Sequence, residues 1–232
     1  MRVNGPDFAA TLALHGIIAE PVAAPFALWL VRAGDGDQRA LSAWLSDAER
    51  DRAARFVVES AARRYRAAHG ALRLLVEACT GIAAAEQRYA FNDHGKPRLA
   101  GMQHVHCSMS YTGAFALVAV ADGAEIGIDI EAVRAVDDAA GLAAMYYTDR
   151  EAAQLGEMAH DSDYDHAFLS VWVRKEACSK ALGKGLSIAP SSFECGVGYG
   201  PRNVLVDGEM LESDVVDPKG GLLMSWALRG RS

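Results

Sequence analysis

Short segments of apolar or alternating residues predict strands in both halves of the chain. Residues 115–120 and 125–131 have this pattern, and residues 121–124 between them include the Asp-Gly pair of a turn. We therefore expect these two segments to pair as a hairpin whose strands are apolar enough to be central. Further strands are expected over residues 26–31, 204–206 and 222–228, of which the last two would complete a second sheet.

The strand expected over residues 125–131 has one apolar and one acidic face. Side chains alternate between the two faces of a strand, so Asp129 and Glu131 project from the same face. The isoleucines at alternate positions project from the other face: Ile126, Ile128 and Ile130. Carboxylates that share a face can bind a hard cation such as Mg²⁺. The same D-x-E pattern is also common on solvated strand faces.

Helices are expected on both sides of this strand. Two pairs have the capping-box spacing that begins a helix: Ser46 with Glu49, and Thr148 with Glu151. Two longer helices are expected over residues 61–79 and 166–182, and Gly183 is well placed to end the second. Helices and strands in both halves predict an α+β fold.

The helix expected over residues 166–182 has a face that could take part in chemistry. Trp172, Glu176 and Lys180 are four residues apart and therefore share one helix face. Glu176 would add a third carboxylate to the two of the acidic strand. Lys175 and Lys180 could neutralise phosphate charge or pair with Glu176 along the helix.

The composition is that of an ordinary globular protein of a reducing compartment. With 232 residues, of which 51% are hydrophobic, the chain can bury one sizeable core or two small ones. Polar residues and a proline interrupt the apolar N-terminal stretches, so we expect no signal peptide, no membrane association and a cytoplasmic location. The cysteines are scattered without the spacing of a zinc site: Cys79, Cys107, Cys178 and Cys195.

The charge is unevenly distributed along the chain. The net charge of -7 argues against binding to nucleic acid. Residues 50–73, however, contain seven arginines against Asp51 and Glu59. This basic segment is either a solvated helix face or a phosphate-binding surface.

Four segments of the chain, in their order and spacing, resemble the phosphopantetheinyl transferase superfamily. The resemblance is to its longer, single-chain type, which activates peptide and polyketide synthetases. The segments are residues 48–56 with 63–65, residues 95–97, residues 127–131, and residues 172–180 followed by 183–185. Each motif is modest alone, but their joint order is specific, and the match spans most of the chain.

The resemblance implies an α+β fold of two similar halves related by a pseudo-twofold, with coenzyme A in the cleft between them. We expect the halves to be residues 1–121, with the coenzyme A phosphate and nucleotide contacts, and residues 122–232, with the metal site and the catalytic helix. The implied reaction is that of a holo-[acyl-carrier-protein] synthase type transferase. It moves the 4'-phosphopantetheine group of coenzyme A to a serine of an apo acyl or peptidyl carrier protein and releases 3',5'-ADP.

The resemblance also assigns roles to individual residues. Asp129, Glu131 and Glu176 match the family's metal ligands, and Mg²⁺ is the expected ion. Glu176 and Lys180 are the expected catalytic residues, and Lys180 also matches a lysine near the pyrophosphate. The positions expected to hold coenzyme A are Arg52, Arg64, Lys96, Ser108 and Lys180.

Two positions depart from the family pattern. Many relatives have a Ser-His-Ser motif whose histidine contacts a coenzyme A phosphate, whereas this chain has Met109 between Ser108 and Ser110. Methionine cannot donate that hydrogen bond. Glu49 also stands where some relatives have lysine. The alternatives are therefore a catalytically silent module that binds coenzyme A or a carrier protein, or another Mg²⁺-dependent phosphoryl-transfer enzyme. We expect a monomer.

Overall fold

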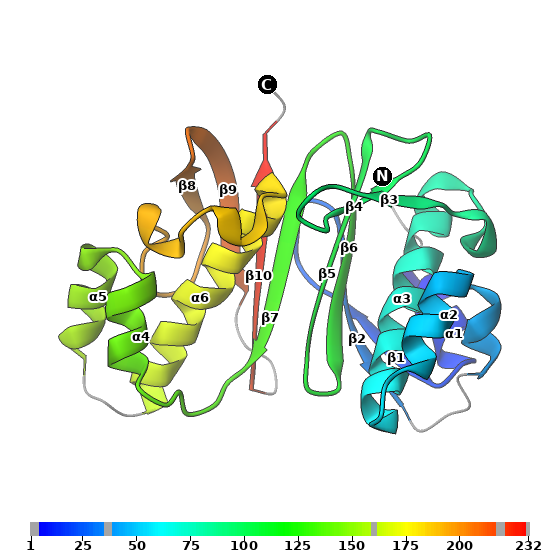
Figure 1. Cartoon of the computed structure of the whole chain (residues 1–232), viewed down its shortest axis with the longest axis horizontal. Helices are drawn as coiled ribbons and strands as arrows, with labels where there is room; N and C mark the ends of the chain where they lie inside the picture. The colour runs from blue at the N-terminus through cyan, green and yellow to red at the C-terminus, as the bar shows by residue number, and fades with distance from the viewer. Residues whose placement is uncertain (1–4, 35–38, 159–161, 217–220, 231–232) are drawn as a thin grey trace. The chain divides into compact units, whose positions relative to one another are not determined.

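A computed structural model describes residues 5–34, 39–158, 162–216 and 221–230. Within these residues the chain forms helices and two antiparallel sheets, which confirms the expected α+β class (Figure 1). Contacts divide the chain into two compact units, Met1–Phe91 with Pro97–Gly123 and Asn92–Lys96 with Ala124–Ser232. The predicted division after residue 121 and the pseudo-twofold relation stay predictions.

The first unit contains a six-stranded sheet in the order β1-β2-β6-β5-β4-β3. Its strands are β1 (Ile17–Pro21), β2 (Ala27–Ala33), β3 (Tyr89–Phe91), β4 (Pro97–Leu99), β5 (Val105–Thr112) and β6 (Phe115–Asp122). Its helices are α1 (Gly5–Ala13), α2 (Asp47–Ala54) and α3 (Glu59–Thr80), with short 3-10 turns η1 (Arg39–Ala43) and η2 (Ala84–Glu86).

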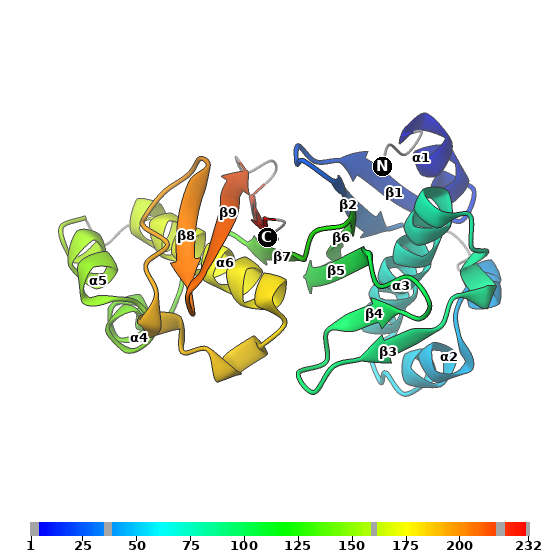
Figure 2. The same cartoon turned by 90° about the horizontal axis from the view of Figure 1, so that it is seen from above.

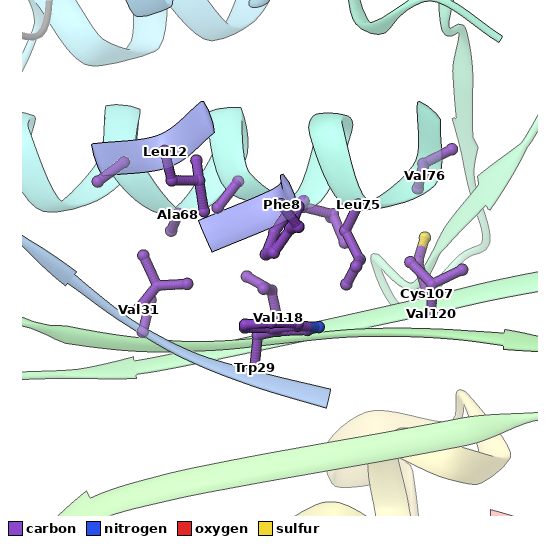
Figure 3. Close-up of a cluster of buried hydrophobic side chains, with 14 of the residues drawn as sticks. Phe8, Leu12, Trp29, Val31, Ala68, Leu75, Val76, Cys107, Val118 and Val120 are labelled. Atoms are coloured by element: carbon purple, nitrogen blue, oxygen red, sulfur yellow. The ribbon is translucent and has the colours of Figure 1, made fainter. Parts of the chain in front are cut away.

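The core of the first unit forms where α1 and α3 pack on the sheet, and α3 runs along the strands in Figure 2. Apolar residues recur along α3 at helical spacing and are buried: Ala67, Ala68, Ala71, Leu72, Leu75 and Val76. Figure 3 shows Phe8 of α1 above Trp29 of β2, and their ring centroids are 4.7 Å apart. Burial of this apolar stripe holds α3 to the sheet.

The second unit contains a four-stranded sheet in the order β7-β10-β9-β8. Its strands are β7 (Ile126–Ala132), β8 (Arg202–Val206), β9 (Glu209–Val216) and β10 (Leu222–Arg229). Its helices are α4 (Ala139–Tyr146), α5 (Asp149–Gly156) and α6 (Ser162–Leu182), with 3-10 turns η3 (Gly185–Ser187) and η4 (Pro190–Ser192). Figure 1 shows α6 packed between the sheet and the pair α4 and α5.

The predicted helix boundaries are confirmed where capping chemistry defines them. Ser46 and Glu49 form a reciprocal capping box at the start of α2, and Thr148 and Glu151 form another at the start of α5. Helix α6 ends at Leu182, and Gly183 follows with a φ of 66°, a left-handed conformation that favours glycine.

The predicted hairpin of residues 115–120 and 125–131 is wrong. Strand β6 pairs with β2 and β5, whereas β7 pairs with β10 in the other sheet. The tight hairpin forms one connection earlier, between β5 and β6, where Thr112 pairs with Phe115 around Gly113. Gly113 has a φ of 52°, which suits this two-residue turn. Residues 123–125 instead connect β6 of the first sheet to β7 of the second.

Candidate active site

The acidic face of β7 lies against helix α6. Ile126, Ile128 and Ile130 are fully buried on the opposite face, as the alternation predicted. Gly127 shares the acidic face, and a Cβ at this position would overlap the backbone of Ala177 and Ala181 in α6. The absence of a side chain at Gly127 therefore lets the helix approach the strand closely.

This close approach places Lys180 of α6 beside Asp129 of β7. The Nζ atom of Lys180 donates to Oδ1 of Asp129 over 2.6 Å. Asp129 is buried, while Lys180 is about one-third exposed. Because this ion pair is partly open to solvent, Lys180 can exchange Asp129 for a charged group of a ligand.

Glu176 belongs to the same group of charges. Burial raises the pKa of Glu176; Lys180 opposes this effect, and the negative charges of Asp129 and Glu131 raise the pKa further. The sequence-predicted set of three acids and one lysine is thus electrostatically coupled within the second unit. The negative charge of the three carboxylates exceeds the single positive charge of Lys180.

The three acids are the residues that the resemblance assigns to a magnesium ion. Among the described residues, no group of three or more His, Cys, Asp or Glu side chains is already arranged to hold a metal ion. Mg²⁺ usually takes one or two protein carboxylates and completes its octahedron with water and substrate phosphates. The donor chemistry of Asp129, Glu131 and Glu176 fits such an ion, because their carboxylate oxygens are the ligands that Mg²⁺ prefers.

Lys175, the neighbour of Glu176, has a different partner from the two considered in the sequence analysis, which were a phosphate and Glu176. Its Nζ atom pairs with the fully buried Glu151 over 2.8 Å and donates to the carbonyl oxygens of Pro190 and Phe193. Burial acts to raise the pKa of Glu151, but the hydrogen bond and charge of Lys175 hold it below its usual range. Lys175 is thus a structural cation of α6.

Lys96 is also engaged within the second unit. Its Nζ atom donates to the Ala181 carbonyl oxygen over 2.7 Å and forms an ion pair with Glu125. Asn92, at the start of the same segment, donates to the Gly183 carbonyl oxygen over 2.7 Å. These contacts could not be predicted from the sequence, because the partners are far apart along the chain.

The other predicted coenzyme A residues, Arg52, Arg64 and Ser108, lie in the first unit. Arg52 is exposed on α2, and its guanidinium lies 5.7 Å from the ring centroid of Phe56. Arg64 on α3 lies over Tyr111 and donates to the Gly113 carbonyl oxygen. Ser108 is buried on β5.

Only part of the basic segment 50–73 faces a protein acid. Arg50 pairs with Asp47, Arg63 and Arg66 with Glu59, and Arg73 with Glu49. These contacts support the solvated or structural interpretation for these four arginines. Arg52, Arg55 and Arg64 remain, and of these Arg52 and Arg64 are the two that the resemblance assigns to coenzyme A.

The structure gives a reason for the glutamate at position 49, where some relatives have lysine. Glu49 accepts from the backbone N–H of Ser46, lies 3.0 Å from Nδ1 of His69, and pairs with the buried Arg73 over 2.8 Å. Burial acts to raise the pKa of Glu49, but hydrogen bonds from His69 and Ser46 and the charge of Arg73 lower it to about 2. Glu49 therefore joins α2 to α3.

Met109 also has a structural role. It packs against the hydrophobic core of the first unit, in which Val105 and Cys107 of the same strand are buried. Residues two apart on a strand share a face, so Met109 lies on the core face and Ser108 on the other. The side chain of residue 109 thus contributes to packing in this chain.

The second unit has a pocket of about 180 Å³ whose lining includes Glu131. It is lined by Glu131, Arg134, Val136, Leu142, Tyr146, Phe168, Leu169 and Trp172. The sequence placed Trp172 on the helix face of Glu176 but gave no indication that α4 and α6 enclose a space there. The lining is mostly apolar, and Glu131 and Arg134 are its charged members.

None of the described helices combines the length and the apolar character that a membrane span requires. All four cysteines are free thiols, and three of them are buried.

Comparison with known proteins connects this site to a family. Residues 125–205 match the model of the 4'-phosphopantetheinyl transferase superfamily. The chain is 31% identical to 4'-phosphopantetheinyl transferase HetI of Nostoc sp. over 150 residues, which cover 63% of this chain and 63% of that protein.

Two Bacillus subtilis proteins are similar to the chain at lower identity. The match to 4'-phosphopantetheinyl transferase Sfp is 26% identical and covers 65% of each chain. A second 4'-phosphopantetheinyl transferase is 27% identical over 68% of this chain and 69% of its own length. The chain thus spans less than two thirds of the length of HetI and Sfp. The part of the chain that is similar to the 4'-phosphopantetheinyl transferase superfamily contains both the acidic strand β7 and helix α6.

Proposed function

We propose that this protein transfers the 4'-phosphopantetheine group of coenzyme A to a serine of an apo acyl or peptidyl carrier protein, releasing 3',5'-ADP. The observation that carries the proposal is the coupling of Asp129, Glu131, Glu176 and Lys180 inside the region that matches the family. This is the charge arrangement that a phosphoryl-type transfer requires.

Each acid has a proposed role in holding the pyrophosphate end of the substrate. Asp129, Glu131 and Glu176 would hold Mg²⁺, which when bound neutralises phosphate charge and favours in-line attack. Lys180 can leave Asp129 for an anionic substrate oxygen, because its side chain is partly exposed. In that position its charge stabilises the departing 3',5'-ADP.

The attacking carrier serine must lose its proton as the new bond forms. Glu176 is the candidate general base, acting directly or through a water molecule. The partly buried position of Glu176 on α6 keeps its carboxylate close to the acidic strand. A carboxylate at that position would accept the proton without leaving the site.

Arg52, Arg64 and Ser108 are the proposed contacts for the phosphates and nucleotide of coenzyme A. Arginine suits phosphate because its planar guanidinium can donate two parallel hydrogen bonds. We further propose that the protein acts as a cytoplasmic monomer, with the halves 1–121 and 122–232 carrying coenzyme A contacts and catalytic groups respectively.

The deciding experiment is intact-mass analysis of apo carrier proteins incubated with this protein and coenzyme A, with and without Mg²⁺. A metal-dependent gain of one phosphopantetheine group, absent when the carrier serine is changed to alanine, supports the proposal. Coenzyme A binding without transfer to any carrier would favour the silent module. Nucleotide hydrolysis without a carrier would favour a different phosphoryl-transfer enzyme.

A further inference from the structure

The segment Asn92–Lys96 lies between two strands of the first unit but belongs by its contacts to the second. Its own geometry is defined by Asn92, whose Oδ1 accepts from the backbone N–H groups of His94 and Lys96 over 3.0 and 2.8 Å. Gly95 adopts a φ of 82° within this turn. The segment, which we call the strap, is therefore a locally ordered turn.

The strap binds the carbonyl end of helix α6. Asn92 donates its side-chain N–H to the Gly183 carbonyl oxygen, and Lys96 donates to the Ala181 carbonyl oxygen, each over 2.7 Å. The last carbonyl groups of a helix have no partner within the helix, and a cation there also interacts favourably with the helix dipole. A Cβ at Gly183 would press against the side chains of Lys96 and Asn92.

Glu125 connects this cap to the acidic strand. It precedes β7 directly, and its carboxylate pairs with Lys96 at a site where the side chains are only 18% and 9% exposed. The backbone carbonyl of Glu125 also accepts from the N–H of Arg229 over 2.9 Å, which fixes it to the end of β10. The beginning of β7 and the end of α6 are thus joined through one lysine.

We propose that Lys96 is a positioning residue, which acts with Glu125 and Asn92 to hold the last turn of α6 at a fixed place along β7. The last turn of α6 carries Lys180, and β7 carries its partner Asp129. The inference rests on the proposed transferase function and replaces the direct phosphate contact expected for Lys96. Moving the Lys96 amine to a phosphate would leave the mostly buried Glu125 carboxylate without this partner, which costs free energy.

The test compares Lys96→Met and Glu125→Gln with Glu209→Gln as a matched control. Glu209 also pairs with a cation of the same unit, Arg229, but its side chain is 42% exposed. If Lys96 positions α6, both strap variants lower kcat about tenfold and leave KM for coenzyme A within twofold. The double variant is then no slower than the Lys96 variant alone. The control leaves both constants unchanged.

If Lys96 instead contacts a phosphate of coenzyme A, the two variants should change KM for coenzyme A in opposite directions. Glu125→Gln would then release Lys96 and lower KM for coenzyme A, whereas Lys96→Met would raise it. That result overturns the inference, and so does a kcat that neither variant changes.

Hydrogen exchange gives a readout that needs no turnover. The amides near residue 183, including the Gly183 N–H that bonds to the Ser179 carbonyl oxygen, should exchange about tenfold faster in both strap variants. If hydrogen exchange of these amides is unchanged in both variants, the strap does not cap helix α6. If the wild-type protein transfers nothing to any carrier, the proposed function fails, and this measurement still decides whether the strap holds α6.

Discussion

The ammonium nitrogen of Lys180 lies 2.6 Å from a carboxylate oxygen of Asp129. One residue comes from helix α6 and the other from strand β7, so the distance reports how these two elements are aligned. The proposed chemistry uses both groups, with Asp129 as a ligand of Mg²⁺ and Lys180 as the cation that meets the leaving group.

The first prediction concerns the loss of the Asp129 charge. Asp129→Asn should lower Mg²⁺-dependent transfer at least about 100-fold, because a neutral amide is a poor ligand for a hard cation. Removal of Mg²⁺ by a chelator should have the same effect on the wild-type protein. Intact-mass assays measure transfer, and circular dichroism checks that the variant remains folded. A folded variant with near-normal turnover would rule out the assigned metal site.

The second prediction separates two neighbouring arginines of α3. Arg64→Met should raise KM for coenzyme A about tenfold with a smaller change in kcat, since the proposed contact is distant from the reacting phosphorus. Arg63→Met is the matched control, because its guanidinium faces Glu59 at 3.8 Å. Steady-state kinetics with coenzyme A varied gives both constants. Equal KM values in the two variants would remove Arg64 from the site.

The third prediction is a pH dependence of stability that arises from Glu49. The folded-state pKa of Glu49 is about 2, against 4.5 for the unconstrained group, so its contribution is fully present above pH 4.5 and is lost as the pH falls toward 2. Glu49→Gln should therefore lower the free energy of unfolding by about 3 kcal/mol at pH 7. At pH 3 the difference in the free energy of unfolding between the wild-type protein and Glu49→Gln should be clearly smaller.

Urea unfolding at both pH values measures this effect. Glu59→Gln is the control, because the Glu59 side chain is 70% exposed, and each of its ion pairs with Arg63 and Arg66 contributes about 1 kcal/mol or less. A difference for Glu49→Gln that stays constant between pH 7 and pH 3 would contradict the assigned network.

The fourth prediction tests the close approach of β7 and α6. Gly127→Ala should destabilise the protein by about 1 to 3 kcal/mol, because its Cβ would displace the helix backbone. It should also lower transfer, since Lys180 and Glu176 move with the helix. Gly156→Ala is the control, because a Cβ at that position meets nothing within 4 Å. Thermal unfolding together with the mass assay detects both effects, and an unchanged Gly127→Ala variant would disprove the steric argument.

The fifth prediction concerns the buried ion pair of Lys175 and Glu151. Lys175→Met should cost about 3 to 5 kcal/mol of stability, because it leaves a buried carboxylate without its cation. Adding Glu151→Gln should recover part of this loss, while KM for coenzyme A stays unchanged in any folded variant. A KM that rises many-fold in a variant of near-normal stability would instead identify Lys175 as a phosphate contact.

The sequence predicted the local features of this protein well. The capping boxes at Ser46 and Thr148 depend on residues three apart, and the acidic face of β7 depends on simple alternation. The hairpin prediction failed because strand pairing depends on tertiary partners, and both β6 and β7 are apolar enough to be central in either sheet.

The sequence also left the partners of the lysines open. Lys96 and Glu125 are 29 residues apart, and only the fold brings them together. The residues around Glu176 offered both Lys175 and Lys180 as phosphate contacts, and only the resemblance selected Lys180. Lys175 is buried beside Glu151, whereas Lys180 faces Asp129. Their different roles follow from the rotation of about 100° per residue, which puts side chains five residues apart on different sides of a helix.

The strap has a consequence for how the polypeptide could be divided. Because Asn92–Lys96 is flanked by parts of the first unit, the backbone changes unit after Phe91, after Lys96 and again after Gly123. The two units are therefore interlaced along the polypeptide and are not joined by a single linker. A fragment that starts at Ala124 would lack the strap, which caps helix α6. We therefore expect split versions of this protein to work only when the N-terminal piece is supplied as well.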